Sequence, residues 1–500
     1  MSQGQSASAA RQAGVGVFWL TMAKFYFMGT GLVLLLFLPA LFKKFAGEQH
    51  VAVYGDYRTV AGLLNWFNMV LVGGTLQAVS KFVSEKETRA RSVKWETLKI
   101  QTVVGGGAAL LLFFGADLIA TRFYDDPSLA IYLRLAAPIV LLYSWYAVII
   151  GCLNGLKRFF HQAGMDMLFA TSKVALTIVL VALGYSISGA IGGFLITAAV
   201  MLAISWVVLG KAPAGERVSW RTIFNFEWKT LLFAFFLNGM LQVDLQLLKA
   251  LAPERLGPAS DQTGIYGAAL QVGQLPYIAI ISVAFVIFPL LSKATFEKET
   301  GKVQEYVRTT NRYVLLFLAG IVAPVVLEGQ NILTVVYPDE YAAGAAIFSL
   351  LATSYFFFAG MVVSANMLTA AGRPMTTAVI FGASLGLSTL LCVLFIPMWG
   401  GMGAAAGVCI AMAVGAVVFG WTCHRQFGAY MPLMSPIRTL LALVPVILLG
   451  HFVLSGGWGF AGLLLRLALL FAVYVTMLFV LREMTVDELK NLASLRRKMA

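Results

Sequence analysis

The sequence predicts an all-α, polytopic membrane protein with about 14 transmembrane helices. Its 500 residues are 60% hydrophobic and only 12% charged, whereas charged residues make up about 25% of ordinary soluble proteins. Apolar segments of about 20 residues, each long enough to cross a bilayer as a helix, recur from end to end. A charged fragment also occurs twice, as SKFVSEKET at 80–88 and SKATFEKET at 292–300, which points to an internal duplication.

The first predicted span is expected to be a retained helix rather than a signal peptide, because no small-residue cleavage pattern follows a short apolar core. The pair 165–186 and 188–209 is separated by so few residues that twelve spans would also fit. The fourteen predicted spans are 14–40, 59–80, 100–120, 132–153, 165–186, 188–209, 229–251, 264–291, 312–335, 343–370, 375–397, 402–422, 437–455 and 459–481.

The net charge of +13 is interpreted as a topology signal rather than as a nucleic-acid surface. With the N-terminus inside, most lysines and arginines fall in inward-facing segments, and positively charged loops stay cytoplasmic. We therefore expect a multi-pass protein of the inner (cytoplasmic) membrane with both termini in the cytoplasm.

Cofactor and metal chemistry are not expected. The four histidines are scattered, and the cysteines have no C-x-x-C spacing and fit helix packing better than metal binding. These cysteines are Cys152, Cys392, Cys409 and Cys423.

The repeated fragment belongs to a longer duplication. At an offset of 212 residues Tyr54 falls on Tyr266 and Ser80 on Ser292, and the offset drifts to 215 where Arg158 falls on Arg373. Both fragments are expected to face the cytoplasm, so the two copies run in the same direction. Parallel repeats of this kind occur in transporters, which place the substrate site between the halves.

The duplication predicts four parts. They are an N-lobe with spans 1–6 at 1–209, a cytoplasmic linker at 210–227, a C-lobe with spans 7–12 at 228–425, and two extra spans with a basic cytoplasmic tail at 426–500.

Three stretches carry a family resemblance: YGDYRTVAGL…GGTLQAVSKFVSEKE, GCLNGLKRFFHQAGMDML, and VVYPDEYAAGAAIFSLLATSYFFFAGMVVSANMLTAAGR. They resemble the polysaccharide-biosynthesis flippases, the Wzx-type members of the multidrug/oligosaccharidyl-lipid/polysaccharide exporter superfamily. The resemblance implies a flippase of polyprenyl-pyrophosphate-linked oligosaccharides that works by alternating access between two six-helix lobes.

Two alternatives of the same superfamily stay open. The last two spans resemble an extra pair found in lipid II flippases, and a cation-coupled multidrug exporter would share the fold. The resemblance also implies a lipid-linked glycan and membrane lipids as partners, with other polysaccharide-assembly membrane proteins as further candidates. We expect a monomer that binds no nucleic acid.

Four basic residues are candidates for binding an anionic headgroup. Lys24 and Lys173 lie inside predicted spans, where an ionisable group is a functional hypothesis by default, and Arg58 and Arg134 lie at span ends. Arginine and lysine in a low-dielectric cavity suit a pyrophosphate. The alternatives are snorkelling for Lys24, structural pairing for Lys173, and interfacial salt bridges for the two arginines.

The seventh predicted span is the most polar. Asn238, Gln242, Gln246 and Lys249 would form one hydrophilic stripe on a continuous helix, and amides offer both donors and acceptors to sugar hydroxyls. Hydrogen bonding between helices is the alternative. Two more amides, Gln271 and Gln274, lie in the next span and extend the predicted substrate-binding set.

Two carboxylates are candidates for coupling to a sodium ion or proton, namely Asp244 and Glu328. Asp244 has the alternative of pairing with a basic residue on a neighbouring helix. An enzyme of the same pathway, such as a polymerase or ligase, is not expected, because the outward loops are short and hold no catalytic set.

Overall fold

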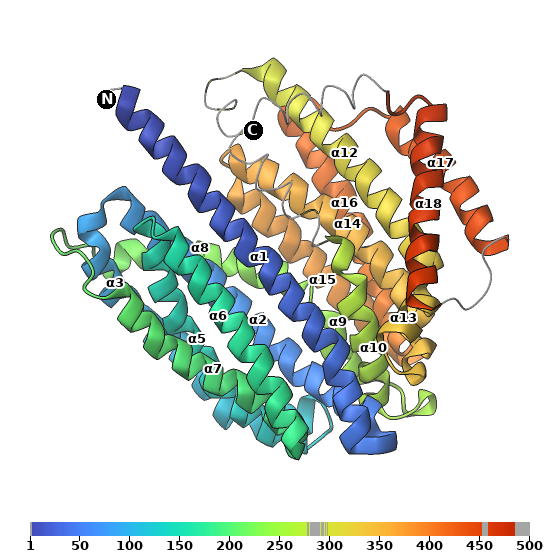
Figure 1. Cartoon of the computed structure of the whole chain (residues 1–500), viewed down its shortest axis with the longest axis horizontal. Helices are drawn as coiled ribbons and strands as arrows, with labels where there is room; N and C mark the ends of the chain where they lie inside the picture. The colour runs from blue at the N-terminus through green and yellow to red at the C-terminus, as the bar shows by residue number, and fades with distance from the viewer. Residues whose placement is uncertain are drawn as a thin grey trace. The chain divides into compact units, whose positions relative to one another are not determined.

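The computed structural model consists almost entirely of helices (Figure 1). It describes residues 3–277, 280, 291, 295, 297, 299–452 and 459–485, without the side chains of 3–18, 20, 21 and 24. The chain divides into two compact units, Met1–Gly264 and Ile265–Ala500. Each unit is described by itself below.

The predicted fold class is confirmed. Within the described ranges, ten helices are long and apolar enough to cross a bilayer, or eleven if one bent pair counts as a span. Two of these, Phe25–Glu85 and Phe159–Leu209, contain two helices each. The predicted span at 264–291 lies partly outside the described residues. The helix number therefore agrees with the expected count of about 14.

The first unit is built around α5, whose buried residues lie on every side of the helix because α2, α3 and α7 all pack against it. Helices α6 and α7 run side by side (Figure 1). The helices of this unit are α1 (Gln3–Ala46), α2 (His50–Glu85), α3 (Ala90–Phe114), α4 (Ala116–Leu118), α5 (Leu129–Gly155), α6 (Phe159–Leu180), α7 (Ser186–Leu209), α8 (Trp220–Gly239) and α9 (Val243–Leu251).

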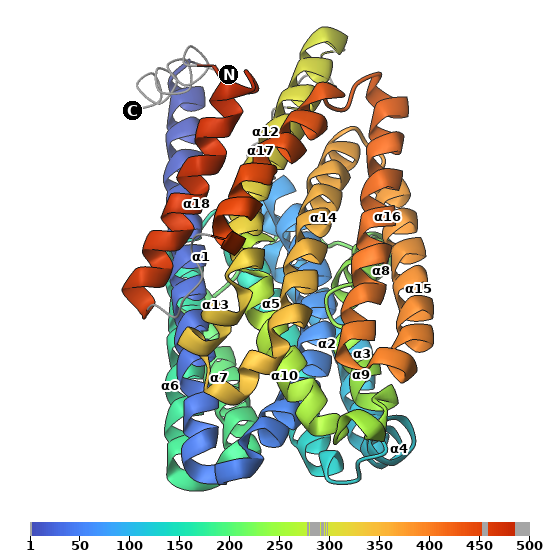
Figure 2. The same cartoon turned by 90° about the vertical axis from the view of Figure 1, so that its right-hand side faces the viewer.

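In the second unit α14 packs against α12 and α16, and α15 lies beside α16 (Figure 2). The last two helices, α17 and α18, pack against α12 and each other. The helices of this unit are α12 (Thr300–Leu327), α13 (Gly329–Val336), α14 (Ala345–Ala370), α15 (Pro374–Trp399), α16 (Gly401–Phe427), α17 (Met434–Phe452) and α18 (Phe460–Val480).

Charged groups fix α17 and α18 to α12. The buried Glu483 carboxylate, just after α18, accepts hydrogen bonds from Arg312 Nε at 2.9 Å and from Ser435 Oγ at 2.6 Å. Arg438 of α17 adds an ion pair to the same carboxylate at 3.3 Å. The two helices that were predicted to lie outside the duplication are therefore integral to the second unit.

Equivalent turns in the two units support the duplication. Lys157 and Gly372, 215 residues apart, both have positive φ, at 58° and 78°. The hydrogen bonds around them also match, since Arg158 N donates to Leu153 O and Arg373 N donates to Leu368 O.

The turn before the last helix of each repeat matches in the same way. Ser186, at φ 48° and ψ −130°, corresponds to Gly400, at φ 57° and ψ −131°. The reversal at Ser186 also shows that 165–186 and 188–209 are two spans rather than one. A serine in this backbone region is strained, and the glycine in the second copy is not.

One prediction about the seventh span was wrong. The span is not a continuous helix, because it breaks at residues 240–242 and α9 is turned by 55° from α8. Gly239 ends α8, and the next residues close with short-range bonds such as Leu241 N to Asn238 O. Glycine is a weak helix former, so a break here is locally inexpensive.

The packing boundary between the units differs from the predicted repeat boundary at 210–227, because α8 and α9 pack against α2 in the first unit. The chain passes from one unit to the other within a helix, α10 (Ala259–Gly273). The start of α10 touches α2 so closely that a Cβ at Gly264 would collide with Val51 O.

The linker is held against the loop between α2 and α3. Arg91 N donates to Pro213 O at 2.9 Å, and Glu216 forms ion pairs with Lys86 and Arg89. Hydrogen bonds from Lys86 and Arg89 lower the pKa of Glu216. The first copy of the repeated fragment thus forms the surface that receives the linker, and most of the second copy lies outside the described residues.

Candidate functional site

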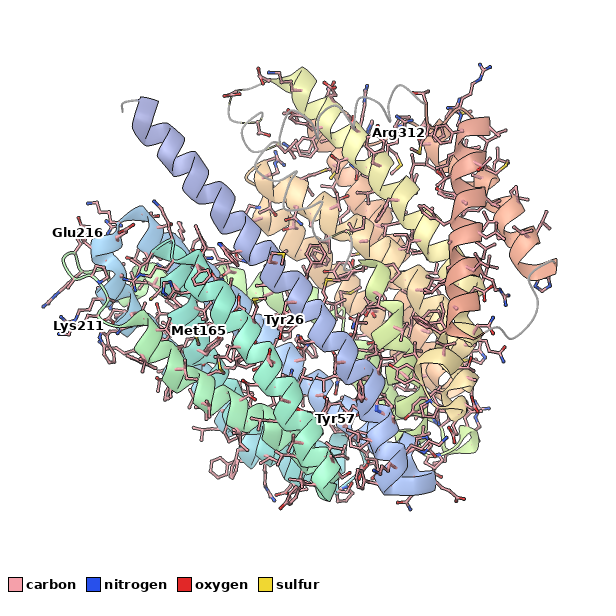
Figure 3. All side chains as sticks on the ribbon, viewed as in Figure 1. Tyr26, Tyr57, Met165, Lys211, Glu216 and Arg312 are labelled. Carbon is pink, nitrogen blue, oxygen red and sulfur yellow. The ribbon has the colours of Figure 1, made fainter. Side chains whose placement is uncertain are left out.

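A line of polar side chains runs between α2 and the α8–α9 pair in the first unit. We call this line the polar seam. One end, the linker end, lies near the 210–219 linker, and the far end lies near the start of α2. Figure 3 shows Lys211 and Glu216 together at the linker end of this unit and Tyr57 toward the other end. The seam contains Asp56, Thr59, Thr75, Gln101, Tyr124, Asp126, Glu227, Gln242, Gln246, Lys249 and Ser260.

At the far end, Lys249 is neutralised by two carboxylates. Its Nζ lies 2.7 Å from Asp56 Oδ1 and 2.8 Å from Asp126 Oδ2, and it also donates to Ser260 Oγ at 2.6 Å. The lysine side chain is 1% exposed. Burial raises the pKa of Asp126, but hydrogen bonds from Lys249 and Ser128 outweigh this effect and hold the pKa below its ordinary value.

In the middle, two glutamines press against α2. A Cβ at Gly62 would stand 2.8 Å from Gln246 Nε2 and 2.9 Å from Gln242 Oε1. Gln246 donates to Thr59 O at 3.2 Å and accepts a hydrogen bond from Tyr124. These contacts join helices, as in the alternative given above, and a role for these amides in sugar binding stays a prediction.

At the linker end, Glu227 of α8 is fully buried. Its Oε1 accepts hydrogen bonds from Thr75 Oγ1 of α2 at 2.8 Å and from Gln101 Nε2 of α3 at 2.7 Å. In the part of the chain that the structure describes, Oε2 has no hydrogen-bond partner and no basic side chain pairs with the carboxylate.

The bend at 240–242 separates the predicted stripe into two parts. Asn238 remains on α8 and donates its amide to Ala234 O at 2.9 Å, whereas Gln246 and Lys249 lie on α9. The prediction that they share one straight helical face was wrong, because it assumed an unbroken helix.

The predicted basic residues have different surroundings. Lys173 is half-buried on α6, with Nζ 4.0 Å from the centre of the Phe194 ring on α7. Arg58 is half-buried on α2, and its Nε has no hydrogen-bond partner among the described residues. Arg134 forms the salt bridge that was its alternative, with Asp117. The Lys24 side chain lies outside the described residues.

The remaining predicted residues are mostly engaged in the fold. Asp244 is buried at the start of α9 and accepts a hydrogen bond from Leu245 N at 2.8 Å. Glu328 is buried at the break between α12 and α13, 2.9 Å from Arg466 Nη2. Gln271 and Gln274 are half-buried within and just after α10.

The sequence reasoning missed Glu227 and Gln101. Glu227 was assigned to the linker because the span was predicted to begin at 229. The missed signal is Ser219, which caps α8 by accepting a hydrogen bond from Arg221 N and so places Glu227 two turns inside the helix.

No group of three or more histidine, cysteine, aspartate or glutamate side chains suited to a metal occurs among the described residues.

Comparison with known proteins decides the family. The family described as "Polysaccharide biosynthesis protein" matches residues 51–346, more than half of the chain. The chain belongs to this family. A relative from Bacillus subtilis (strain 168), the uncharacterized membrane protein YabM, is 24% identical over 381 residues, or 71% of each chain.

Solved structures support the fold of this polysaccharide biosynthesis protein. It resembles the lipid II flippase MurJ in its inward closed conformation, with a TM-score of 0.74 and 15% identity over 92% of this chain and 98% of that one. It also resembles an inward-facing multidrug resistance MATE family transporter of the MOP superfamily, with a TM-score of 0.65 and 15% identity over 81% and 94%. At these identities the likeness concerns the fold.

Proposed function

We propose that this protein is a flippase that moves a polyprenyl-pyrophosphate-linked oligosaccharide across the cytoplasmic membrane by alternating access. The observation that carries this proposal is its membership of the polysaccharide biosynthesis family combined with a fold that matches a lipid II flippase over nearly its whole length. Both termini are proposed to be cytoplasmic, and the protein to act as a monomer.

Two basic side chains of the first unit support an anionic substrate. Lys173 and Arg58 have no carboxylate partner in the described part of the chain. A contact with an aromatic ring stabilises the Lys173 ammonium without cancelling its charge. A pyrophosphate is a dense anion that such groups bind well where water is scarce.

The membrane potential would assist this direction of transport. With the inside negative, outward movement of each negative charge is favoured by about 2.3 kcal/mol per 100 mV. In the proposed cycle the headgroup passes through the protein while the polyprenyl tail remains in lipid.

The test is a strain that lacks this protein, examined for lipid-linked glycan trapped on the cytoplasmic leaflet. Expression of the wild-type chain is expected to restore surface glycan, and Lys173→Ala to reduce it at least tenfold at equal membrane abundance. Arg134→Ala is the matched control, because the Arg134 charge is already paired with Asp117. Wild-type glycan in Lys173→Ala would remove the proposed anion site.

The same strain separates the alternatives. The lipid II alternative is favoured by the match to MurJ, which extends over 92% of this chain. Accumulation of cell-wall precursor in place of another lipid-linked glycan would establish it. A change in drug sensitivity with normal glycan and cell-wall precursors would establish an exporter instead.

A further inference from the structure

Among the described residues, no positive charge balances the buried Glu227 carboxylate. An ionised carboxylate taken out of water costs several kcal/mol unless it is paired and hydrogen-bonded. Glu227 is fully buried, and both of its hydrogen bonds come from neutral side chains, Thr75 and Gln101. These bonds satisfy Oε1 and leave Oε2 unmet in the described structure.

A second buried oxygen, next to Glu227, also lacks a donor among the described residues. Gln101 donates a hydrogen bond from its amide nitrogen to Glu227. The other amide atom of Gln101, Oε1, has no hydrogen-bond partner among the described residues. The missing component at Glu227 Oε2 and Gln101 Oε1 is therefore an electron-pair acceptor, which means a cation or a proton.

The charged groups on the surrounding helices are occupied elsewhere. On α3, Lys94 Nζ lies 4.6 Å from the Trp206 ring centre, and on α2, Lys81 Nζ lies 4.1 Å from the Phe226 ring centre. On α8 itself, Arg221 and Lys229 are exposed. The Cys152 thiol, on α5, interacts with Lys94.

We propose that Glu227 binds one monovalent cation, either a sodium ion or a proton, with Gln101 and Thr75 completing the site. A hard cation prefers carboxylate, amide and hydroxyl oxygens, which are the groups present. Occupancy would set how firmly α8 is held against α2 and α3. The link from this binding to transport rests on the flippase function proposed above, whereas the binding itself does not.

The test uses the purified full-length chain with no glycan present, so its outcome is independent of the flippase proposal. Radioactive sodium binding and proton uptake, followed with an indicator dye, are measured on the wild type and on Glu227→Gln. The midpoint of thermal unfolding is followed while sodium replaces choline at constant ionic strength, and separately as the pH is lowered.

If the ion is sodium, the wild-type unfolding midpoint rises with sodium by an amount of the order of a few degrees and one sodium ion binds per chain. If it is a proton, the midpoint rises as the pH falls, without a sodium effect, because the folded state binds the extra proton. Glu227→Gln should abolish whichever dependence is observed. Glu216→Gln, which removes an exposed carboxylate, should retain it.

A second variant keeps the proposal testable if Glu227→Gln does not fold. Gln101→Met removes the amide and keeps the carboxylate. It should weaken sodium binding about tenfold, the equivalent of one lost hydrogen bond to a charged group. If the ion is a proton, the pH dependence should instead move to higher pH, because the hydrogen bond that Gln101 donates favours the ionised carboxylate. The proposal is overturned if the wild type shows neither dependence. It is equally overturned if the variants at Glu227 and Gln101 respond as the wild type does.

Discussion

Glu227 in the first unit and Glu328 in the second are both carboxylates buried in apolar helices, at 0% and 1% exposure, but their partners differ. Glu328 lies 2.9 Å from the Arg466 guanidinium and accepts a further hydrogen bond from Asn331 at 2.7 Å. Glu227 is held by a hydroxyl and an amide. The charge of Glu328 is therefore balanced within the fold, whereas no residue that the structure describes balances the charge of Glu227.

The difference separates a structural carboxylate from an exchangeable one. A permanent cationic partner fixes the ionised state and joins α18 to the break between α12 and α13. A carboxylate with neutral partners can gain or lose a positive charge without breaking an ion pair. Glu328, a candidate for ion coupling in the sequence analysis, has a permanent cationic partner. Glu227 has only neutral partners among the described residues.

The largest effect is expected for Glu328→Gln. The substitution leaves the Arg466 charge buried without its carboxylate, and breaking a buried pair from one side costs about 3–5 kcal/mol of the free energy of unfolding. Denaturation of the purified protein in detergent measures the loss. The double variant Glu328→Leu/Arg466→Leu should recover most of it, and a single variant as stable as the wild type would refute the structural role.

The next effect concerns Lys249, which balances two carboxylates rather than one. Lys249→Met keeps the aliphatic stem and leaves Asp56 and Asp126 facing each other, at 16% and 22% side-chain exposure. Because solvent reaches both carboxylates, we expect a loss of about 2–3 kcal/mol, below that for a fully buried pair. Lys302→Met, at an exposed i,i+3 pair with Glu299, is the control and should leave the stability nearly unchanged.

A smaller effect is expected from pH. The folded-state pKa of Asp126 lies below its unfolded value, so its contribution to stability is complete above the unfolded pKa and is lost as the pH falls through the folded one. Acidification should therefore destabilise the wild type more than Lys249→Met, in which the main cause of the lowered pKa is gone. Unfolding midpoints measured across the acidic range, at constant salt, test this, and parallel curves would contradict it.

The smallest effect on stability is expected for Glu227→Gln, measured at neutral pH without sodium. The glutamine keeps the oxygen that accepts from Thr75 and Gln101, and it removes a charge that has no partner in the described structure. The free energy of unfolding should stay within about 1 kcal/mol of the wild type. A loss as large as that of Glu328→Gln would mean that the two carboxylates are equivalent after all.

Much of the fold was predictable because helix length and apolarity are properties of local sequence. The separate spans at 165–186 and 188–209 were predicted correctly, and the matching turns at Arg158 and Arg373 agree with the repeat. The break at 240–242 was not predicted, because a single glycine in a span is compatible with either a straight helix or a bent one.

The candidate site was harder to predict because side-chain partners come from other helices. Nothing near Lys249 in sequence shows that Asp126 lies 2.8 Å from its Nζ, 123 positions away. The stripe through Asn238 and Gln246 depended on a helix that bends. Glu227 was missed through an error in one helix boundary, and such boundaries are the least reliable part of a sequence-based assignment.

The close approach of α10 to α2 within the first unit has a consequence for Gly264. A side chain at this position would meet the Val51 carbonyl, a backbone atom that cannot give way unless α2 itself shifts. Any residue other than glycine would therefore push the start of α10 away from α2.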